Sequence, residues 1–458
     1  MCIKSIDKEK GFFPPLGLLY IATYLKKHTA HEVRVLDCNT EHIDVPRLET
    51  VLLEFQPDIV GVSTITHHLI DAYAAAAVIK KISTDIITVF GGAHASIYPI
   101  TTVENSNIDY AIRGEGEIVF TELVRAIEQN KSLAEISAIP GIATKYLAKR
   151  GLKNGDIQRL FIDDLDSLPS PDRTLVPYKK YHNILSPNRY MTTMFTTRGC
   201  PYHCVFCNRM GRKVRSLSPG KVLSEIETLL KLGINEIFFK DDTFTIDQDR
   251  VKLICKGIID RNYAFTWQVR TRADCFDFEL LSLMKKAGCS RISFGIESGD
   301  PHILKMLRKE LDFELARNVV QWCRQLGIQT LANYIIGCPG ETKKEIHKTL
   351  LFAERLGTDY ALFFILSLYP DTDLYRQAMA SGLVPGDVWL DFAKNPTRAF
   401  IAPIWNENFS REELEEISKN IHKRFFIRPG LILREMKKIE SPNEFIKKVR
   451  AAWNLWQA

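Results

Sequence analysis

The first 145 residues alternate short apolar runs with segments of helical periodicity. This alternation is typical of a parallel sheet with helices on both faces, and it predicts an α/β, doubly wound (Rossmann-like) domain. The predicted strands are Val33–Leu36, Ile59–Val62, Ile86–Phe90 and Tyr110–Ile112. The predicted helices are Val45–Phe55, ended by a turn at Gln56-Pro57-Asp58, then Asp71–Ile82 and Ile118–Glu128.

A second series of six strand-and-helix units follows in residues 191–375. Six units in one run are typical of a partial (β/α)6 barrel of the TIM type, with its active site at the C-terminal ends of the strands. The predicted strands are Met194–Thr197, Glu236–Phe239, Thr266–Val269, Arg291–Phe294, Gln329–Ile336 and Ala361–Leu368.

Two further segments complete the predicted organisation. Residues 146–190 carry four prolines among polar residues, as expected of a linker that lies over a surface. Residues 376–458 have a mainly helical pattern. We therefore expect domains at 1–145 and 191–375, joined by this linker and followed by a helical C-terminal region.

Composition narrows the class of protein. Of the 458 residues, 45% are hydrophobic and 25% are charged, which is ordinary for a globular protein and excludes disorder as the main state. The net charge of +6 is small for this length, so no nucleic-acid partner is expected. No apolar run reaches a membrane-span length and the N-terminus lacks a signal-peptide core, so the expected location is cytoplasmic.

Three of the ten cysteines fall within eight residues. Cys200, Cys204 and Cys207 follow the first predicted strand of the barrel, on a loop at its catalytic rim. Three thiolates can hold three irons of a 4Fe–4S cubane and leave the fourth iron open. Structural zinc would need a fourth ligand, for which His203 is the one candidate within the loop.

The Cys-x3-Cys-x-aromatic-Cys spacing, with Thr197-Arg198-Gly199 before it, resembles the signature of radical S-adenosylmethionine enzymes. Three segments at predicted strand ends resemble the parts of this family that surround adenosylmethionine. These segments are Lys240–Phe244, Gly295–Gly299 and Ile336–Thr342.

The resemblance implies roles for individual residues. Phe206 would pack against the cluster and adenine, Asp241 or Asp242 would accept bonds from the amino group of adenosylmethionine, and Glu297 would bind the ribose hydroxyls. Arg272 would face the carboxylate, and Gly337 belongs to the segment at the end of the fifth strand. For each charged residue the alternative is structural, as a helix cap or an ion pair.

The N-terminal domain resembles the cobalamin-binding domain of class B radical enzymes. The similar segments are Phe13–Ile21, Gly61–Thr64, Gly91–Ala95 and Gly114–Glu117. From these segments we expect cofactor contacts at Pro14, Gly17, Ser63, Thr64, Gly91, Gly92, His94, Glu115 and Gly116.

Two departures from cobalamin proteins stand beside this resemblance. The chain lacks Asp-x-His-x-x-Gly, the segment that supplies a lower axial imidazole in one group of these proteins, and residues 1–10 match an apolar first strand poorly. His67, His68 and His94 are candidates near the corrin, with axial ligation or a structural role left open. His94 fits better in a pocket for the nucleotide tail.

The cofactors implied are a 4Fe–4S cluster, S-adenosylmethionine and cobalamin, and the implied enzyme is a carbon methyltransferase. A 5′-deoxyadenosyl radical would take hydrogen from an unactivated carbon, and methylcobalamin would supply the methyl group. The substrate would be a small or lipid-like molecule. An electron donor such as flavodoxin or ferredoxin would be a partner.

Other functions remain open. The resemblance extends to the anaerobic magnesium-protoporphyrin ester cyclases, which use the same cofactors for oxidative cyclisation without net methylation. A methylthiotransferase would carry further N-terminal cysteines, and a cobalamin or cluster sensor would not need the polar strand ends, so the sequence argues against both.

Two basic segments each allow two interpretations. The run Arg209–Arg215 either binds a substrate phosphate or carboxylate or is a solvated loop. The stretch Lys419–Arg434, with Trp453 and Trp456 beyond it, either makes a peripheral membrane contact or contains a helix that packs on the barrel.

Overall fold

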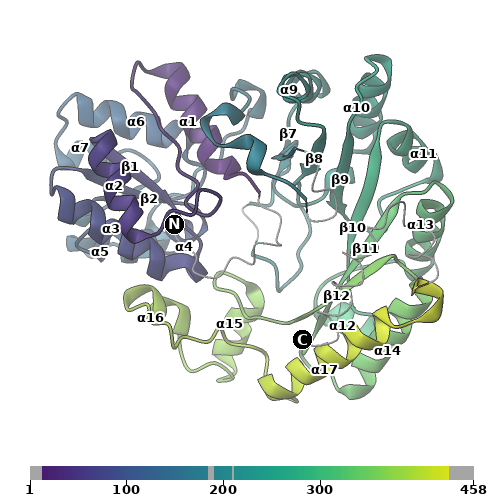
Figure 1. Cartoon of the computed structure of the whole chain (residues 1–458). Helices are drawn as coiled ribbons and strands as arrows, with labels where there is room; N and C mark the ends of the chain where they lie inside the picture. Colours follow the sequence, from purple (N-terminus) through teal and green to yellow (C-terminus); the bar gives the residue numbers. More distant parts are fainter. Residues whose placement is uncertain (1–12, 184–189, 209–210, 433–458) are drawn as a thin grey trace. The chain divides into compact units, whose positions relative to one another are not determined.

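The computed structural model describes residues 13–183, 190–208 and 211–432 (Figure 1). The chain forms two compact units, each built from separate segments. Unit 1 holds the chain up to residue 198 together with 213–238 and 386–401, and unit 2 holds 199–212, 239–385 and the chain from 402 onward.

Unit 1 contains a four-stranded sheet in the order β1-β2-β3-β4. The first three strands are parallel, and β4 runs antiparallel to β3. The bounds are β1 (Ile59–Ser63), β2 (Ile87–Gly91), β3 (Tyr110–Ile112) and β4 (Ile142–Thr144). The helices of this part are α1 (Leu16–His28), α2 (Val45–Phe55), α3 (Leu69–Ile82), α4 (Ala93–Ile97), α5 (Pro99–Glu104), α6 (Gly116–Glu128), α7 (Leu133–Ser137) and α8 (Lys145–Lys149).

Adjacent residues of these strands pack against helices on opposite faces of the sheet. Phe90 packs with Ala72 and Ala76 of α3, while its neighbour Val89 packs with Leu123 of α6. Helices therefore cover both faces, which confirms the doubly wound domain.

A six-stranded sheet follows, in the order β12-β11-β10-β9-β8-β5. Its six strands follow chain order, with β5 and β12 at the two ends, which confirms the partial barrel. The bounds are β5 (Met191–Met194), β8 (Glu236–Phe239), β9 (Thr266–Thr271), β10 (Cys289–Glu297), β11 (Gln329–Ile336) and β12 (Tyr360–Ile365). The helices between these strands are α9 (Pro219–Lys231), α10 (Gln248–Asp260), α11 (Phe278–Lys286), α12 (Pro301–Met306), α13 (Phe313–Gln325) and α14 (Lys343–Leu356).

The C-terminal region is helical, as expected. It contains α15 (Asp373–Ala380), α16 (Val388–Lys394) and α17 (Arg411–Phe426). α17 packs on β12, where His422 accepts a hydrogen bond from the Phe363 backbone at 3.1 Å and the Phe425 ring lies 6.1 Å from that of Phe363. The helix-packing interpretation of this stretch is therefore confirmed up to residue 432, and Trp453 and Trp456 lie outside the described residues.

Two predicted strands are wrong. No strand forms at Val33–Leu36, where Val35 is buried beside Leu19 of α1 and so produces an apolar pattern without a sheet. The strand predicted at Met194–Thr197 lies instead at Met191–Met194. Its Thr192 and Thr193 are buried next to Arg173, which is buried as well and donates a hydrogen bond to the Thr193 carbonyl at 2.8 Å. This hydrogen bond offsets part of the cost of burying polar groups, and no local sequence pattern reveals it.

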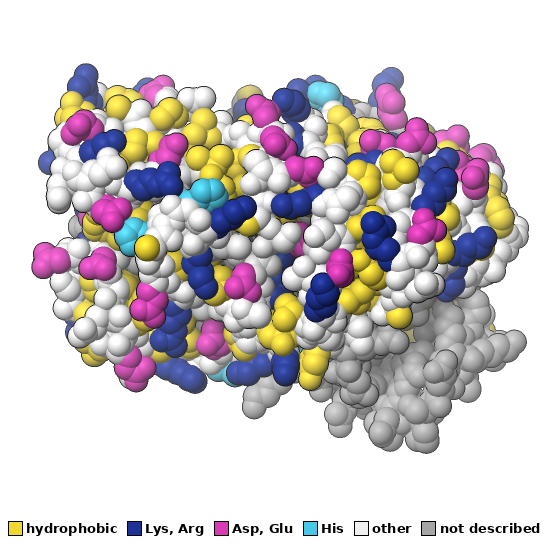
Figure 2. All heavy atoms as spheres, turned by 90° about the horizontal axis from the view of Figure 1, so that it is seen from above, with side chains coloured by type: hydrophobic (Ala, Val, Ile, Leu, Met, Phe, Trp, Pro, Cys, Tyr) yellow, Lys and Arg dark blue, Asp and Glu magenta, His cyan; other side chains and the backbone are white. Residues whose placement is uncertain are grey.

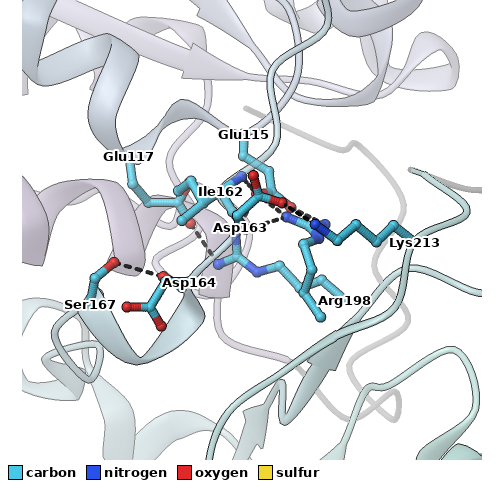
Figure 3. A network of polar contacts seen from close by, with 9 residues as sticks. Glu115, Glu117, Ile162, Asp163, Asp164, Ser167, Arg198 and Lys213 are labelled. Carbon is cyan, nitrogen blue, oxygen red and sulfur yellow. Dashed lines mark hydrogen bonds and ion pairs between the residues drawn. The ribbon is translucent and has the colours of Figure 1, made fainter.

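The loop with the three cysteines is closed at its base by a short hairpin in unit 1. β6 (Thr197–Arg198) pairs antiparallel with β7 (Arg215–Ser216), so Arg198 lies opposite Arg215. Both arginines bind the segment that follows β3 (Figure 3). Arg215 donates to both carboxylate oxygens of Glu115 at 2.7 and 2.8 Å, and Arg198 donates to Glu117 at 2.6 Å.

This network is buried and geometrically specific. The side chain of Arg215 is 3% exposed and that of Glu117 is 5% exposed. Burial alone would raise the pKa of Glu115, but the hydrogen bonds from Arg215 and the charge of Arg198 hold that pKa below its ordinary value. Glu115 also accepts a bond from the Ile162 backbone at 2.7 Å. The base of the cysteine loop is thus fixed by charge-assisted bonds in a site with little water.

We predict that Arg215→Met lowers the free energy of unfolding by about 3 kcal/mol, because it leaves the Glu115 carboxylate buried without its bidentate partner. Chemical denaturation of the purified protein measures this loss. Lys213→Gln is the matched control on the same strand connection, since Lys213 pairs with Asp163 at the surface, where both side chains are more than 70% exposed. The control should keep the wild-type free energy of unfolding, and equal effects of the two changes would contradict the prediction.

Candidate functional site

The cysteine loop itself belongs to unit 2 and is held there by its backbone. Val205 is 2% exposed, and its N–H donates to the Leu307 carbonyl at 3.2 Å while its own carbonyl accepts from the Leu374 N–H at 2.9 Å. Gly199 and Gly211 have φ values of +93° and +100°, which favour glycine. Cys200, directly after Gly199, donates to the Gly211 carbonyl at 3.3 Å.

The three cysteine side chains of this loop differ in exposure. Cys207 is exposed, whereas Cys200 and Cys204 are half-buried. Burial raises the pKa of Cys204, and the charge of Lys309 opposes that shift. Among the described residues no three side chains of His, Cys, Asp or Glu gather closely enough to hold one metal ion.

A cubane cluster fits this arrangement. Each of its thiolates binds a different iron, so the three sulfurs need not converge on one point. Phe206 lies half-buried between Val205 and Cys207, next to the thiols on the chain. The sequence places His203 in the same loop, where its side chain is exposed.

Glu297 stands at a bulge at the end of β10. The strand register shifts between Gly295 and Glu297, and Glu297 has a φ of +67°. Such a bulge redirects a side chain at a strand end. Lys309 binds the Glu297 carboxylate at 2.6 Å, and both side chains are nearly buried. A side chain at Gly295 would lie 2.4 Å from that carboxylate, so the ion pair explains this glycine.

Arg272 is occupied by protein contacts. It donates to both carboxylate oxygens of Asp274, at 2.8 and 2.6 Å, and to the Glu310 carbonyl. Its guanidinium lies 4.2 Å from the ring centre of Tyr202, in the cysteine loop. The structure thus places Arg272 against this loop, in an ion pair and a cation–π contact.

The acidic segment after β8 contains one buried and one exposed carboxylate. Asp241 is fully buried, and Asp242 is exposed. Thr243, the next residue, lies 3.9 Å from the Cys200 sulfur through its hydroxyl. Burial lowers the pKa of Lys240 to about 8, and the charge of Arg270 adds to that shift.

The segment after β11 contains a buried carboxyl group that we did not predict. Glu341 accepts from the backbone N–H groups of Gly337 and Cys338 at 2.7 and 3.0 Å. Its second oxygen is buried without a hydrogen-bond partner, and burial raises its pKa to about 7. Gly337 itself has a φ of +79°, and a side chain there would lie 2.7 Å from Leu414.

The candidates for cobalamin contact in unit 1 gather at the ends of β1 and β2. Thr64 donates to the Gly91 carbonyl at 3.0 Å, and the Thr64 carbonyl accepts from His94 at 3.1 Å. A side chain on Gly92 would lie 2.7 Å from the same carbonyl. Ser63 is exposed beside this group.

His94 is the most distinctive member of this group. The ring is fully buried, its Nδ1 lies 3.2 Å from the Thr66 hydroxyl, and its Nε2 has no hydrogen-bond partner. Burial lowers the His94 pKa to about 4, so the ring is neutral at pH 7. An unpartnered buried nitrogen is an atom that a ligand can satisfy.

The remaining candidates have different surroundings. Pro14 is buried just before α1, Gly17 is exposed in the first turn of that helix, and Gly116 begins α6. The Glu115 carboxylate is taken by Arg215 and the Ile162 N–H.

Sequence reasoning missed the residues that hold the candidates in place. Arg215 was expected either to bind a substrate anion or to lie in a solvated loop, and it does neither, because it is buried against Glu115. Arg209 of the same run lies outside the described residues. Lys309 and Glu341 were not singled out. Glu341 had a local signal, since an acidic residue four positions after Gly337 lies within reach of the N–H groups of that turn.

We predict that Glu341 makes unfolding pH-dependent between about pH 4.5 and 7. Its pKa is raised from 4.5 to about 7 in the folded state, so its contribution to stability is complete below 4.5 and is lost as the pH rises through 7. Glu341→Gln keeps an oxygen acceptor without the charge, so its melting temperature should rise relative to wild type from pH 5 to 8.

Thermal melts at matched pH values test this difference. Glu412→Gln is the control, because hydrogen bonds at the start of α17 hold the pKa of Glu412 below its ordinary value and the group does not titrate in this interval. Parallel curves for wild type and Glu341→Gln would contradict the prediction.

Comparison with known proteins agrees with this geometry. The profile of the radical SAM superfamily matches residues 194–353, and that of the B12 binding domain matches residues 6–124. An uncharacterized methyltransferase of Pyrococcus horikoshii is 32% identical over 440 residues, which cover 95% of this chain and 92% of that protein. The anaerobic magnesium-protoporphyrin IX monomethyl ester cyclase of Rubrivivax gelatinosus is 30% identical and covers 92% of this chain and 75% of its own length.

A solved structure shows the same fold. The radical S-adenosylmethionine methyltransferase TsrM from Kitasatospora setae, with cobalamin and a 4Fe–4S cluster bound, superposes with a TM-score of 0.69 at 22% identity. The match covers 81% of this chain and 72% of TsrM. Two matched domain profiles and similarity along nearly the whole sequence show that the chain belongs to the cobalamin-binding radical S-adenosylmethionine enzymes, which use a 4Fe–4S cluster, S-adenosylmethionine and cobalamin.

Proposed function

We propose that this enzyme transfers a methyl group to an unactivated carbon of its substrate. The observation that carries the proposal is the 32% identity to a methyltransferase over 95% of the chain. The cysteine loop supports it, because three thiols stand on one loop that both the hairpin at its base and the backbone of Val205 hold in place.

The cofactors supply a carbon radical and a methyl donor when bound. In the proposal Cys200, Cys204 and Cys207 each bind one iron, and Phe206 packs beside them. Lys309 binds the Glu297 carboxylate and orients it for a hydroxyl group of adenosylmethionine. Asp241 is fully buried, so its carboxylate has little freedom to move. A carboxylate held in this way suits an acceptor for the amino group of adenosylmethionine.

The contacts of Arg272 change its proposed role. Its guanidinium binds Asp274 and the Glu310 carbonyl and stacks on Tyr202, so we assign Arg272 to positioning the cysteine loop. Gly337 gives the turn after β11 its left-handed backbone, and Glu341 holds the N–H groups of that turn.

Unit 1 would bind cobalamin through the ends of β1 and β2. Ser63, Thr64, Gly91 and Gly92 present backbone and small side chains there, so a large ligand can approach closely. The unpartnered Nε2 of His94 would accept or donate one bond to it. The domains proposed are 1–145 for cobalamin and 191–375 for the radical chemistry, with a linker at 146–190 and a helical region at 376–458.

A second candidate function is an oxidative cyclisation without net methylation. It is favoured by the 30% identity to the ester cyclase of Rubrivivax gelatinosus over 92% of this chain. The two functions share their cofactors and differ in the product, which gains a methyl group in one case and loses hydrogen in the other.

The partners proposed are a small-molecule or lipid-like substrate and a one-electron donor such as flavodoxin or ferredoxin, in the cytoplasm. No helix among the described residues is both long and apolar enough to cross a membrane. On the face drawn in Figure 2, basic and acidic side chains are interspersed.

We predict that anaerobic reconstitution loads about four irons per chain and that Cys204→Ala abolishes 5′-deoxyadenosine formation, because three thiolates are required to hold the cluster. Iron analysis and chromatography of the reaction with dithionite and adenosylmethionine measure both. Cys38→Ala removes a thiol from unit 1 and should retain iron and product. Undiminished 5′-deoxyadenosine in Cys204→Ala would refute the cluster assignment.

A labelled methyl group separates the two candidate functions. We predict that the reconstituted enzyme, incubated with cobalamin, reductant, methyl-deuterated adenosylmethionine and an extract of its own cells, yields a product that carries three deuterium atoms. Mass spectrometry of the extract detects this product. A dehydrogenated product without deuterium would replace the methyltransferase proposal with the cyclase.

A further inference from the structure

The hydroxyl of Thr243 lies against a sulfur of the cysteine loop. Thr243 Oγ1 is 3.9 Å from Cys200 Sγ, and both residues belong to unit 2. Sulfur has a larger radius than oxygen, so a hydrogen bond to sulfur joins atoms that are further apart than those of a bond to oxygen. The two residues are 43 positions apart along the chain, so the fold, and not a local turn, makes this contact.

The two residues after Thr243 fix the position of its backbone. The ring of Phe244 is buried and stacks on that of Phe239, at the end of β8, with 5.0 Å between the ring centres. The Thr245 hydroxyl lies 2.5 Å from the hydroxyl of Thr271, at the end of β9. Aromatic packing on one strand and a hydroxyl pair with the next therefore hold the segment from which the Thr243 side chain projects.

The Thr243 hydroxyl does not cap the helix that it precedes. Thr243 stands directly before the short 3-10 helix Phe244–Ile246, a position where a threonine hydroxyl often accepts a bond from a backbone N–H. In this described segment no side-chain capping bond forms, and the hydroxyl lies beside Cys200 instead. Its placement is therefore explained by the sulfur and not by the end of the helix.

The direction of this hydrogen bond follows from the chemistry of a bound cluster. In a free thiol either atom can be the donor, because both the hydroxyl and the thiol carry a hydrogen. A thiolate bound to iron has no hydrogen, so the Thr243 hydroxyl must donate and the Cys200 sulfur must accept. Thr243 is only 4% exposed, and the low dielectric of a buried site strengthens such a bond.

The cations near the cysteine loop are already paired. The charges of Lys309 and Arg272 act on Cys204, but each of these side chains binds a carboxylate at 2.6 Å. At a distance the opposite charges of an ion pair largely cancel, so its field is weaker than that of a single cation. A hydroxyl dipole in direct contact with a sulfur therefore has a large influence on the charge that this loop can stabilise.

We infer that Thr243 is a positioning residue for the cluster, which donates a hydrogen bond to the Cys200 thiolate and thereby raises the reduction potential of the cluster. An added electron increases the negative charge on the sulfurs, so a donor stabilises the reduced cluster more than the oxidised one. The inference rests on the proposed binding of the cluster by the three cysteines. It adds to that proposal the residue that sets how readily an electron enters.

A redox titration of the reconstituted full-length protein tests this role. The EPR signal of the reduced cluster is followed against the solution potential, without adenosylmethionine or substrate, so turnover does not contribute. Thr243→Val keeps a side chain of similar size and removes the hydroxyl. We expect the equilibrium constant for reduction to fall about tenfold, which lowers the midpoint potential by about 59 mV for a one-electron couple.

Two further variants assign the shift to the hydroxyl. Thr243→Ser retains a donor at the same position and should keep the wild-type midpoint potential. Thr245→Val is the matched control, because it removes a buried hydroxyl from the same segment whose partner is Thr271 and not a sulfur. It should also keep the wild-type midpoint.

Deuterium ENDOR spectroscopy in heavy water detects the hydrogen bond without reference to the potential. Wild type and Thr243→Ser should show an exchangeable deuteron coupled to the reduced cluster, and Thr243→Val should lack it. Thr243→Ala takes the place of the valine variant in both measurements if the valine variant loads iron poorly.

Iron analysis of each variant separates this inference from the cluster assignment. The inference is overturned if Thr243→Val holds about four irons and keeps the wild-type midpoint, or if Thr245→Val shifts the midpoint equally. The cluster assignment would stand in both cases, whereas wild type that binds no iron would overturn both. A shifted midpoint without any deuterated product would refute the proposed methyl transfer and leave this inference standing.

Discussion

The bidentate pair between Glu115 and Arg215 is the contact on which the proposed chemistry depends most. A loop that holds a cluster by three cysteines needs ends that do not move, and this pair fixes one strand of the hairpin from which the loop leaves. Arg198, two residues before Cys200, fixes the other strand through its bond to Glu117. Arg198 also lies 3.5 Å from the Glu115 carboxylate, so the four charges form one connected network in energetic terms.

The same network joins the segment after β3 to the hairpin at the base of the cysteine loop. Glu115 and Glu117 follow β3 at the edge where ligands of doubly wound sheets bind, and Gly116 between them begins α6. The two carboxylates bind arginines of the hairpin, so the acidic side chains of this Gly-rich segment hold the base of the cysteine loop.

Regular elements could be predicted where local pattern and tertiary environment agree. Val45–Phe55, Tyr110–Ile112, Glu236–Phe239 and Gln329–Ile336 have the predicted bounds, since their apolar periodicity matches the burial that they find. The strand at Met191–Met194 was misplaced because its two threonines are buried against Arg173, whose partner Glu225 comes from α9. The Thr193 carbonyl and Arg173 are 20 residues apart along the chain, and Arg173 and Glu225 are 52 apart, so this compensation cannot be recognised from neighbouring residues.

The candidate site shows the same limit at the level of single charges. The cysteine spacing is a local signal, and it identified Cys200, Cys204 and Cys207 without reference to the fold. Arg272 was expected to face the carboxylate of adenosylmethionine, and only the structure shows that it binds both carboxylate oxygens of Asp274. The sequence around Arg272 does not reveal this ion pair, because the contacts of a charged side chain depend on how its strand is placed against its neighbours, which no motif encodes.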